Sequence, residues 1–313
     1  MRRFRVGRVL ATLTLVPAAA LAVSAPSFGE AERAAHIDSG KQRVKYGKRV
    51  TLHGKFPDAP NTAIEIRFRR AGADVFRTVR NAKTGPRGGY RVRVRPRATG
   101  HWRAEVANPQ ELRADGGLLA PGTADLETGS HRIRVKSKTK ARLSRANVVR
   151  GSKTRVKGRV LPATGGRKVV VRVGGKSYTT RTNKKGKFSR SFRVNSTGTR
   201  KVRVEAKGDR RATGSKDRAG RVTGYRPAAA SYYGPGFYGN RTACGQTLTP
   251  GMLGVAHKTM PCGTKLKLMY GGRVVRVRVI DRGPYAGHRE FDLTEATKRR
   301  LGFGSTGTVY ASR

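Results

Sequence analysis

The stretch VRVRVIDRGPYAG, Val275–Gly287, gives the clearest indication of how the C-terminal region folds. Valine and arginine alternate over Val275–Val279, which is the two-residue period of a β-strand with one apolar and one charged face. The run ends in an acid, Asp281, and the chain then turns through an Arg-Gly-Pro segment. On strict alternation Asp281 continues the valine face, so we expect its carboxyl group at the rim of a β structure.

The segments around this stretch predict a small, mostly β domain over residues 231–313. Apolar alternation at Lys265–Leu268 indicates another strand, and glycine-rich turns separate the strands. One short helix is expected over Thr294–Leu301, with Asp292 as its N-cap and Gly302 at its end.

Five motifs of this region, in this order, resemble the double-psi β-barrel domain of the rare lipoprotein A (RlpA) family, lytic transglycosylases of peptidoglycan. They are the segments Ala-Ser-Tyr-Tyr-Gly from residue 230, Gly-Val-Ala-His-Lys-Thr from 254, Pro-Cys-Gly-Thr from 261, Asp-Arg-Gly-Pro from 281 and Phe-Asp-Leu-Thr from 291. The same barrel serves expansins and some cellulases, so the resemblance implies the fold more firmly than the activity.

The resemblance implies three functional positions, and this chain matches two of them. They are an acid after a Thr-Ala-x-Gly segment, the histidine of Ala-His-Lys-Thr and the aspartate of Asp-Arg-Gly-Pro, which fall on Gln246, His257 and Asp281. We expect Asp281 and His257 to be catalytic. Gln246 replaces the family's glutamate, and an amide binds a sugar through hydrogen bonds but cannot exchange a proton.

Four further residues are expected to contact a glycan together with Gln246: Tyr232, Tyr233, Arg282 and Asp292. Each has a structural alternative. The tyrosines can pack in the core, Arg282 can neutralise Asp281, and Asp292 can cap the helix. His257 can equally be a structural histidine.

The two cysteines, Cys244 and Cys262, are expected to form a disulfide that closes a loop of about 18 residues. Such a bond contributes ~3 kcal/mol to stability. The two cysteines and six scattered histidines show no metal-ligand spacing, so neither a metal nor a cofactor is expected.

Upstream of the barrel the sequence repeats with a period of about 100 residues. Residues 44–56 resemble 148–160, and residues 88–106 resemble 186–206. Short alternating segments and glycine-rich turns indicate two immunoglobulin-like β-sandwich repeats, over residues 37–136 and 137–224. The Pro/Ala-rich residues 225–230 are typical of a linker. The expected fold class is therefore mainly β, with two such repeats before a C-terminal double-psi β-barrel.

The N-terminus and the charge predict where the protein acts. A basic start and a 15-residue apolar run, Val9–Val23, indicate a signal peptide over residues 1–25 rather than a membrane span. A net charge of +51 requires a polyanionic partner. Because export argues against physiological nucleic acid, we expect a secreted, cell-wall-associated protein whose basic repeats bind anionic wall polymers.

Three functions agree with these features. The first is a lytic transglycosylase-like enzyme that cleaves peptidoglycan glycan strands to 1,6-anhydro products, with Asp281 as acid and base. The second is a non-catalytic, expansin-like wall-binding module, which Gln246 favours. The third is a secreted polyanion binder whose barrel is only structural.

Overall fold

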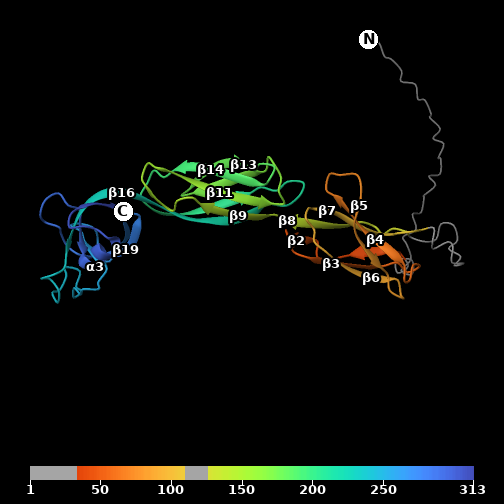
Figure 1. Ribbon diagram of the computed structural model, residues 1–313, viewed down its shortest axis with the longest axis horizontal. Helices are drawn as coiled ribbons and strands as arrows, with labels where there is room; N and C mark the ends of the chain where they lie inside the picture. The colour runs from red at the N-terminus through yellow and green to blue at the C-terminus, as the bar shows by residue number, and fades with distance from the viewer. Residues whose placement is uncertain (1–33, 110–125) are drawn as a thin grey trace, which may run out of the picture.

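Figure 1 shows three β-rich bodies in a row, here named the first body (residues 34–109 and 126–136), the second body (137–224) and the C-terminal body (225–313). The computed structural model describes residues 34–109 and 126–313. The predicted signal peptide, residues 1–25, lies outside this described part. The mainly β fold class is confirmed, and α3 (Glu295–Leu301) is the single helix of the described residues. None of the described segments forms a helix long and apolar enough to cross a bilayer.

The first body consists of two sheets that share one core. One sheet has the order β1-β3-β6 and the other β2-β8-β7-β4-β5. Their strands are β1 (His36–Asp38), β2 (Arg43–Lys45), β3 (Val50–Lys55), β4 (Ala63–Arg70), β5 (Arg77–Lys83), β6 (Gly89–Val94), β7 (Gly100–Val106) and β8 (His131–Lys136). Leu52 from one sheet and Ile64 and Ile133 from the other are fully buried in that core. Alternation therefore places the apolar residues between the sheets and most arginines outside.

The second body repeats this arrangement around its own core of valines and phenylalanines. One sheet has the order β14-β11-β9, and β13-β12-β15-β16 forms the other, with β10 paired to β16. The bounds are β9 (Lys138–Leu143), β10 (Asn147–Val149), β11 (Lys153–Leu161), β12 (Lys168–Val173), β13 (Lys176–Arg181), β14 (Lys187–Arg193), β15 (Gly198–Ala206) and β16 (Ser215–Tyr233). Along β14, Phe188 and Phe192 are buried, whereas Lys187 and Arg193 are exposed.

The predicted linker at residues 225–230 is instead part of β16, a continuous strand of 19 residues. Its first part pairs with β15 in the second body, and its last part pairs with β20 and β21 in the C-terminal body. Tyr225 is fully buried and donates its hydroxyl to Asn147 Oδ1 (3.0 Å). Ala228 and Ala230 pack in the C-terminal core. Small residues that are typical of a linker thus allow close packing, and one strand joins the two bodies.

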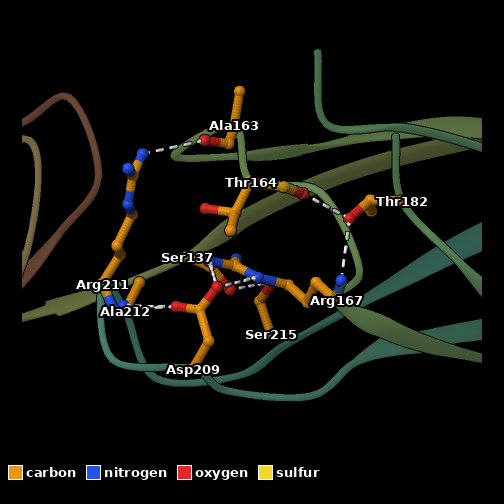
Figure 2. A network of polar contacts seen from close by, with 9 residues as sticks. All are labelled: Ser137, Ala163, Thr164, Arg167, Thr182, Asp209, Arg211, Ala212 and Ser215. Carbon is orange, nitrogen blue, oxygen red and sulfur yellow. Dashed lines mark hydrogen bonds and ion pairs between the residues drawn. The ribbon is translucent and has the colours of Figure 1, made fainter. Parts of the chain in front are cut away.

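A buried ion pair supports the junction between the first and second bodies. The Arg167 side chain is 1% exposed and donates through Nε and Nη2 to Asp209 Oδ2 (2.8 and 2.5 Å). Figure 2 shows the two side chains pointing toward one another. Asp209 Oδ1 also accepts from the backbone N–H groups of Arg211 (2.9 Å) and Ala212 (3.0 Å). Asp209 therefore shapes the turn that inserts Ala212 into the core of the first body.

The C-terminal body consists of the end of β16 and five further strands. These are β17 (Gly254–Ala256), β18 (Lys265–Tyr270), β19 (Arg273–Asp281), β20 (Phe291–Thr294) and β21 (Gly307–Ala311). Pairing runs in the order β16-β20-β17-β19-β18-β21, and β21 also pairs with β16. The strands surround a core of aliphatic residues and two phenylalanines.

The helix α3 begins one residue later than predicted, and its cap differs. The N-cap is Thr294, whose side chain accepts from the Thr297 N–H. Asp292 lies within β20 instead. The predicted stop is confirmed, because Gly302 adopts the left-handed conformation (φ 67°) and donates its N–H to the last turn. Asp292 is therefore free for another role.

Candidate functional site

Asp281 lies at the end of β19, but not on the valine face that strict alternation predicts. The pairing of β17 with β19 shifts between Val255 and Ala256, so Val255 pairs with Val279 and Ala256 pairs with Asp281. Ile280 is the extra residue of a β-bulge. Val255 and Val279 belong to the core cluster. Asp281 therefore points to the opposite side, away from the core, together with the arginines of the strand.

The bulge brings two aspartates and a serine into one row across four neighbouring strands. Asp281 of β19 pairs with Ala256 of β17, Ala256 pairs with Asp292 of β20, and Asp292 pairs with Ser231 of β16. One strand separates the two aspartates, and neighbouring strands are about 4.8 Å apart, so their Cα atoms are about 10 Å apart. The residue between them, Ala256, is small and buried.

The Asp281 carboxylate uses one oxygen for the protein and leaves the other open. Oδ1 accepts from the backbone N–H groups of Ala243 and Arg282, both at 2.8 Å. Oδ2 accepts no bond of ordinary geometry from a described residue, and the nearest side-chain donor is the Tyr233 hydroxyl, which lies close to this carboxylate. No guanidinium pairs with this carboxylate among the described ion pairs. Oδ2 is thus available to a ligand.

The predicted disulfide between Cys244 and Cys262 is present, with their Cα atoms 5.6 Å apart. Cys244 follows Ala243, the residue that donates to Asp281. Cys262 lies in the turn before β18, where the Gly263 N–H donates to Val279 O (2.8 Å). The bond therefore attaches the loop over Asp281 to a turn that is hydrogen-bonded to β19, the strand that carries Asp281.

Asp292 and Tyr233 give this row unusual proton chemistry. Burial raises the pKa of Asp292, and the charge of Asp281 adds to that effect, against a hydrogen bond from Ser231 Oγ (2.7 Å). The Tyr233 hydroxyl is buried and has no hydrogen-bond partner among the described residues. Burial, and then the nearby Asp281, raise the pKa of Tyr233. The row thus combines an open carboxylate, a more easily protonated carboxyl group and a protonated phenol.

His257 is held in a separate charged group beside this row. Its Nδ1 accepts from the backbone N–H groups of Met260 (2.9 Å) and Thr259 (3.2 Å), so the neutral ring carries its proton on Nε2. Nε2 lies 3.5 Å from Glu290 Oε1. Glu290 is itself paired with Arg226, and that hydrogen bond keeps the pKa of Glu290 low. The side chain of His257 is thus directed toward Glu290, and only its backbone N–H bonds to Asp281 O (3.1 Å).

The remaining predicted residues occupy different places. Arg282 donates to the carbonyl oxygens of Met260 (3.1 Å) and His257 (3.4 Å), so it holds the turn beside the site. Tyr232 lies on the other side of β16 from Tyr233, with Lys298 Nζ 3.5 Å above its ring centre. Gln246 is exposed in the loop after Cys244, and its side chain makes no hydrogen bond to a described residue.

Sequence reasoning missed two contributors to the site, Ser231 and Ala243, and did not predict the contact of Glu290 with His257. Ser231 bonds to Asp292, Ala243 donates its backbone N–H to Asp281, and Glu290 orients His257. Ser231 lies in one of the five motifs and was the easiest to detect. In residues 34–109 and 126–313, no group of three or more His, Cys, Asp and Glu side chains is placed to hold a metal ion.

Comparisons with known proteins concern this C-terminal region. A family model described as lytic transglycolase matches residues 227–311. A probable endolytic peptidoglycan transglycosylase RlpA of Synechocystis is 41% identical over 93 residues, which cover 29% of this chain and 29% of that relative. The endolytic peptidoglycan transglycosylase RlpA of Campylobacter jejuni is 42% identical over 82 residues, which cover 26% of this chain and 30% of that relative. The match thus spans less than a third of either relative.

For the upstream bodies the comparison with solved structures is weak. Fibronectin(III)-like modules of Clostridium thermocellum CbhA align with 61% of this chain at 17% identity and a TM-score of 0.24, too low to support a statement about fold. For the C-terminal region the family model and both relatives agree. Residues 227–311 are an RlpA-like double-psi β-barrel.

Proposed function

We propose, from the RlpA-like character of residues 227–311, that this protein is exported to the cell wall and cleaves peptidoglycan glycan strands there as a lytic transglycosylase. The observation that carries the proposal is the row of Asp281 and Asp292 on one outer face of the barrel, separated only by Ala256. Glycoside cleavage needs a proton donor and a proton acceptor on the two sides of a sugar bond. Two carboxyl groups in unlike surroundings supply both.

The environment of each carboxyl group suggests its role. Asp292, whose pKa is raised, gives its proton to the glycosidic oxygen as the bond to the muramic acid carbon breaks. Asp281 Oδ2 takes the proton of the 6-hydroxyl, and that oxygen attacks the same carbon to form the 1,6-anhydro ring. The 6-hydroxyl is the nucleophile, so no water is activated.

His257 acts as a positioning residue in this proposal. Its contacts with the Thr259 and Met260 N–H groups and with Glu290 fix the turn that also holds Arg282. The carbonyl of Asp281 accepts from the His257 N–H. His257 thereby orients the backbone at Asp281, whereas the proton transfer is carried by the aspartates.

The upstream bodies serve as anchors to the wall. We infer that they are the two immunoglobulin-like repeats, 37–136 and 137–224, since each has two sheets around one core. Along β6 the burial alternates, so that Arg91 and Arg93 are exposed and Val92 and Val94 are buried. Such rows of cations are suited to anionic wall polymers, with which they interact along the length of a strand.

The direct test is digestion of purified sacculi by the mature chain, with soluble products analysed by mass. The expected result is release of 1,6-anhydro-muropeptides. For variants that remove a carboxylate from the site, the matched control is Asp74→Asn. It removes an exposed carboxylate from the first body and should leave the products unchanged. Binding to sacculi without any product would reject the enzyme and favour the non-catalytic, expansin-like module.

Gln246→Glu is expected to increase product release about tenfold or more, because it restores an ionisable group to the loop beside Asp281. Gln246 is exposed and its side chain is unbonded to described residues, so the free energy of unfolding should change by less than about 0.5 kcal/mol. Initial rates on sacculi measure the effect. Equal rates for the two chains would show that Gln246 lies outside the reacting groups.

The raised pKa of Asp292 predicts a pH-dependent gain in stability from Asp292→Asn. The folded state holds this proton more tightly than the unfolded chain, so stability from this group is greatest in acid and is lost as the pH rises through the raised pKa. Asparagine cannot ionise, and it keeps the acceptor for Ser231. At about pH 7 the variant should therefore melt higher than the wild type, and below about pH 4 the two should coincide. A difference that is the same at both pH values would contradict this.

A further inference from the structure

We propose that the cleft between the second body and the C-terminal body is a binding site for a chain of phosphate groups. The cleft has a volume of about 730 Å³ and is lined by residues from β15, β18, β19 and the C-terminal segment. Five of the lining residues are cationic, namely Lys265, Lys267, Arg276, Arg278 and Arg313, and no aspartate or glutamate lines it. The proposal rests on the anionic partner of the proposed function and is independent of the cleavage reaction.

The four cations on β18 and β19 form two like-charged pairs. These strands are antiparallel, with Lys265 directly opposite Arg278 and Lys267 directly opposite Arg276. Like charges at such positions destabilise a sheet. None of the four takes part in an ion pair with a described residue. The fold thus tolerates an unfavourable arrangement that a bound anion would neutralise.

Neutral groups of the second body hold Lys267 at the centre of the cleft. Its Nζ donates to Thr223 Oγ1 (3.1 Å) and Thr199 Oγ1 (3.2 Å), which leaves one of three ammonium protons without a partner. Burial, and then the charge of Arg276, lower the pKa of Lys267. The backbone of Lys267 is held by Ser312: the Lys267 N–H donates to Ser312 Oγ (2.8 Å), and the Ser312 N–H donates to Lys267 O (3.0 Å). The ammonium group is therefore fixed in place without a counter-ion.

The types of cation favour phosphate over carboxylate. A guanidinium group binds two oxygens of one anion through its planar fork, and an ammonium group binds one more as a point charge. The cleft presents both kinds as cross-strand neighbours, which suits an anion with at least three accessible oxygens around one centre. Its volume exceeds what one phosphate fills, and its cations follow each other along the strands at about 6.8 Å. A linear polymer with repeated phosphates fits this pattern.

A second cleft offers a matched control. It lies between the first and second bodies, has a volume of about 680 Å³ and is lined by several lysines, including Lys136 and Lys138. It also contains Glu205, which pairs with Lys207 (2.7 Å) and Arg172 (3.3 Å). An internal counter-ion is thus present in this cleft, and removal of two charges here tests the effect of net charge alone.

The experiment measures binding of the full chain to glycerol phosphate oligomers and to inorganic polyphosphate by calorimetry at about 0.15 M salt. The double variant Arg276→Gln with Arg278→Gln should bind either phosphate chain at least about tenfold more weakly, as expected from lost charged hydrogen bonds. The control Lys136→Gln with Lys138→Gln should bind nearly as well as the wild type. Binding of only one phosphate chain identifies the source of the ligand.

Two results would overturn the proposal, because only net charge would then matter: equal weakening in both double variants, or equally tight and equally affected binding of a carboxylate polymer such as polyglutamate. Melting of the ligand-free variants excludes misfolding. The Arg276→Gln, Arg278→Gln variant should be at least as stable as the wild type, since it removes repulsion. Product release from sacculi that lack phosphate polymers should be unchanged in this variant, so failure of the site and failure of the enzyme give different results.

Discussion

Asp281→Asn is expected to reduce the release of 1,6-anhydro products by about 100-fold or more, the usual contribution of a positioned acid or base. Asparagine has nearly the same shape, and its Oδ1 still accepts from the Ala243 and Arg282 N–H groups. The change therefore removes proton exchange at Oδ2 and leaves the loop and the bulge in place. Initial rates on purified sacculi, with products identified by mass, measure the loss.

Two controls accompany the Asp281→Asn measurement. The melting temperature of Asp281→Asn should match that of the wild type, which shows that the site is intact. Asp281→Asn should still sediment with sacculi, because the cations of the upstream bodies are untouched. If Asp281→Asn releases anhydro products at the wild-type rate, the proposed reaction loses its base, and the row of Asp281 and Asp292 has no catalytic meaning.

Asp209→Ala is expected to lower the free energy of unfolding by about 3 to 5 kcal/mol, the usual cost of leaving one member of a buried ion pair alone. The Arg167 side chain is 1% exposed, and its Nη1 already lacks a partner, so its charge would have no neutralising group. The turn that places Ala212 in the first core would lose two hydrogen bonds as well. Chemical denaturation of the full chain measures the effect.

The double variant Arg167→Leu with Asp209→Ala is the control for this prediction. Removing both charges avoids the buried unpaired guanidinium, so the double variant should recover a large part of the loss. Equal destabilisation in the single and the double variant would mean that the turn at Asp209, rather than the charge, accounts for the whole effect.

The repeat and the motifs made most of the architecture predictable. The similarity of residues 88–106 to 186–206 indicated two β bodies of the same kind, and the five motifs indicated the C-terminal barrel. The even number of cysteines, together with the predicted signal peptide, indicated the disulfide that the structure contains. These signals depend on local pattern or on motif order, both of which a single sequence displays.

The sequence-based predictions that proved wrong concern positions where two local conformations are acceptable and tertiary packing decides between them. Val279, Ile280 and Asp281 read as a regular strand, and no glycine marks the bulge that turns Asp281 away from the core. Asp292 and Thr294 are both good N-caps, and the spacing from Asp292 to Glu295 favoured the wrong one. The Arg226–Glu290 pair joins residues 64 positions apart, so no local pattern predicts that His257 faces Glu290.

The continuous strand β16 has a mechanical consequence for work on a large solid substrate. One strand belongs to the ladders of both the second body and the C-terminal body, so the two cannot rotate against each other without loss of backbone hydrogen bonds. If the proposed function holds, a catalytic domain on a flexible linker would sample a sphere around its attachment point, whereas the C-terminal body keeps a fixed distance and orientation relative to the second body. The place where the second body binds the wall would therefore determine which glycosidic bonds of the surrounding peptidoglycan Asp281 and Asp292 can reach.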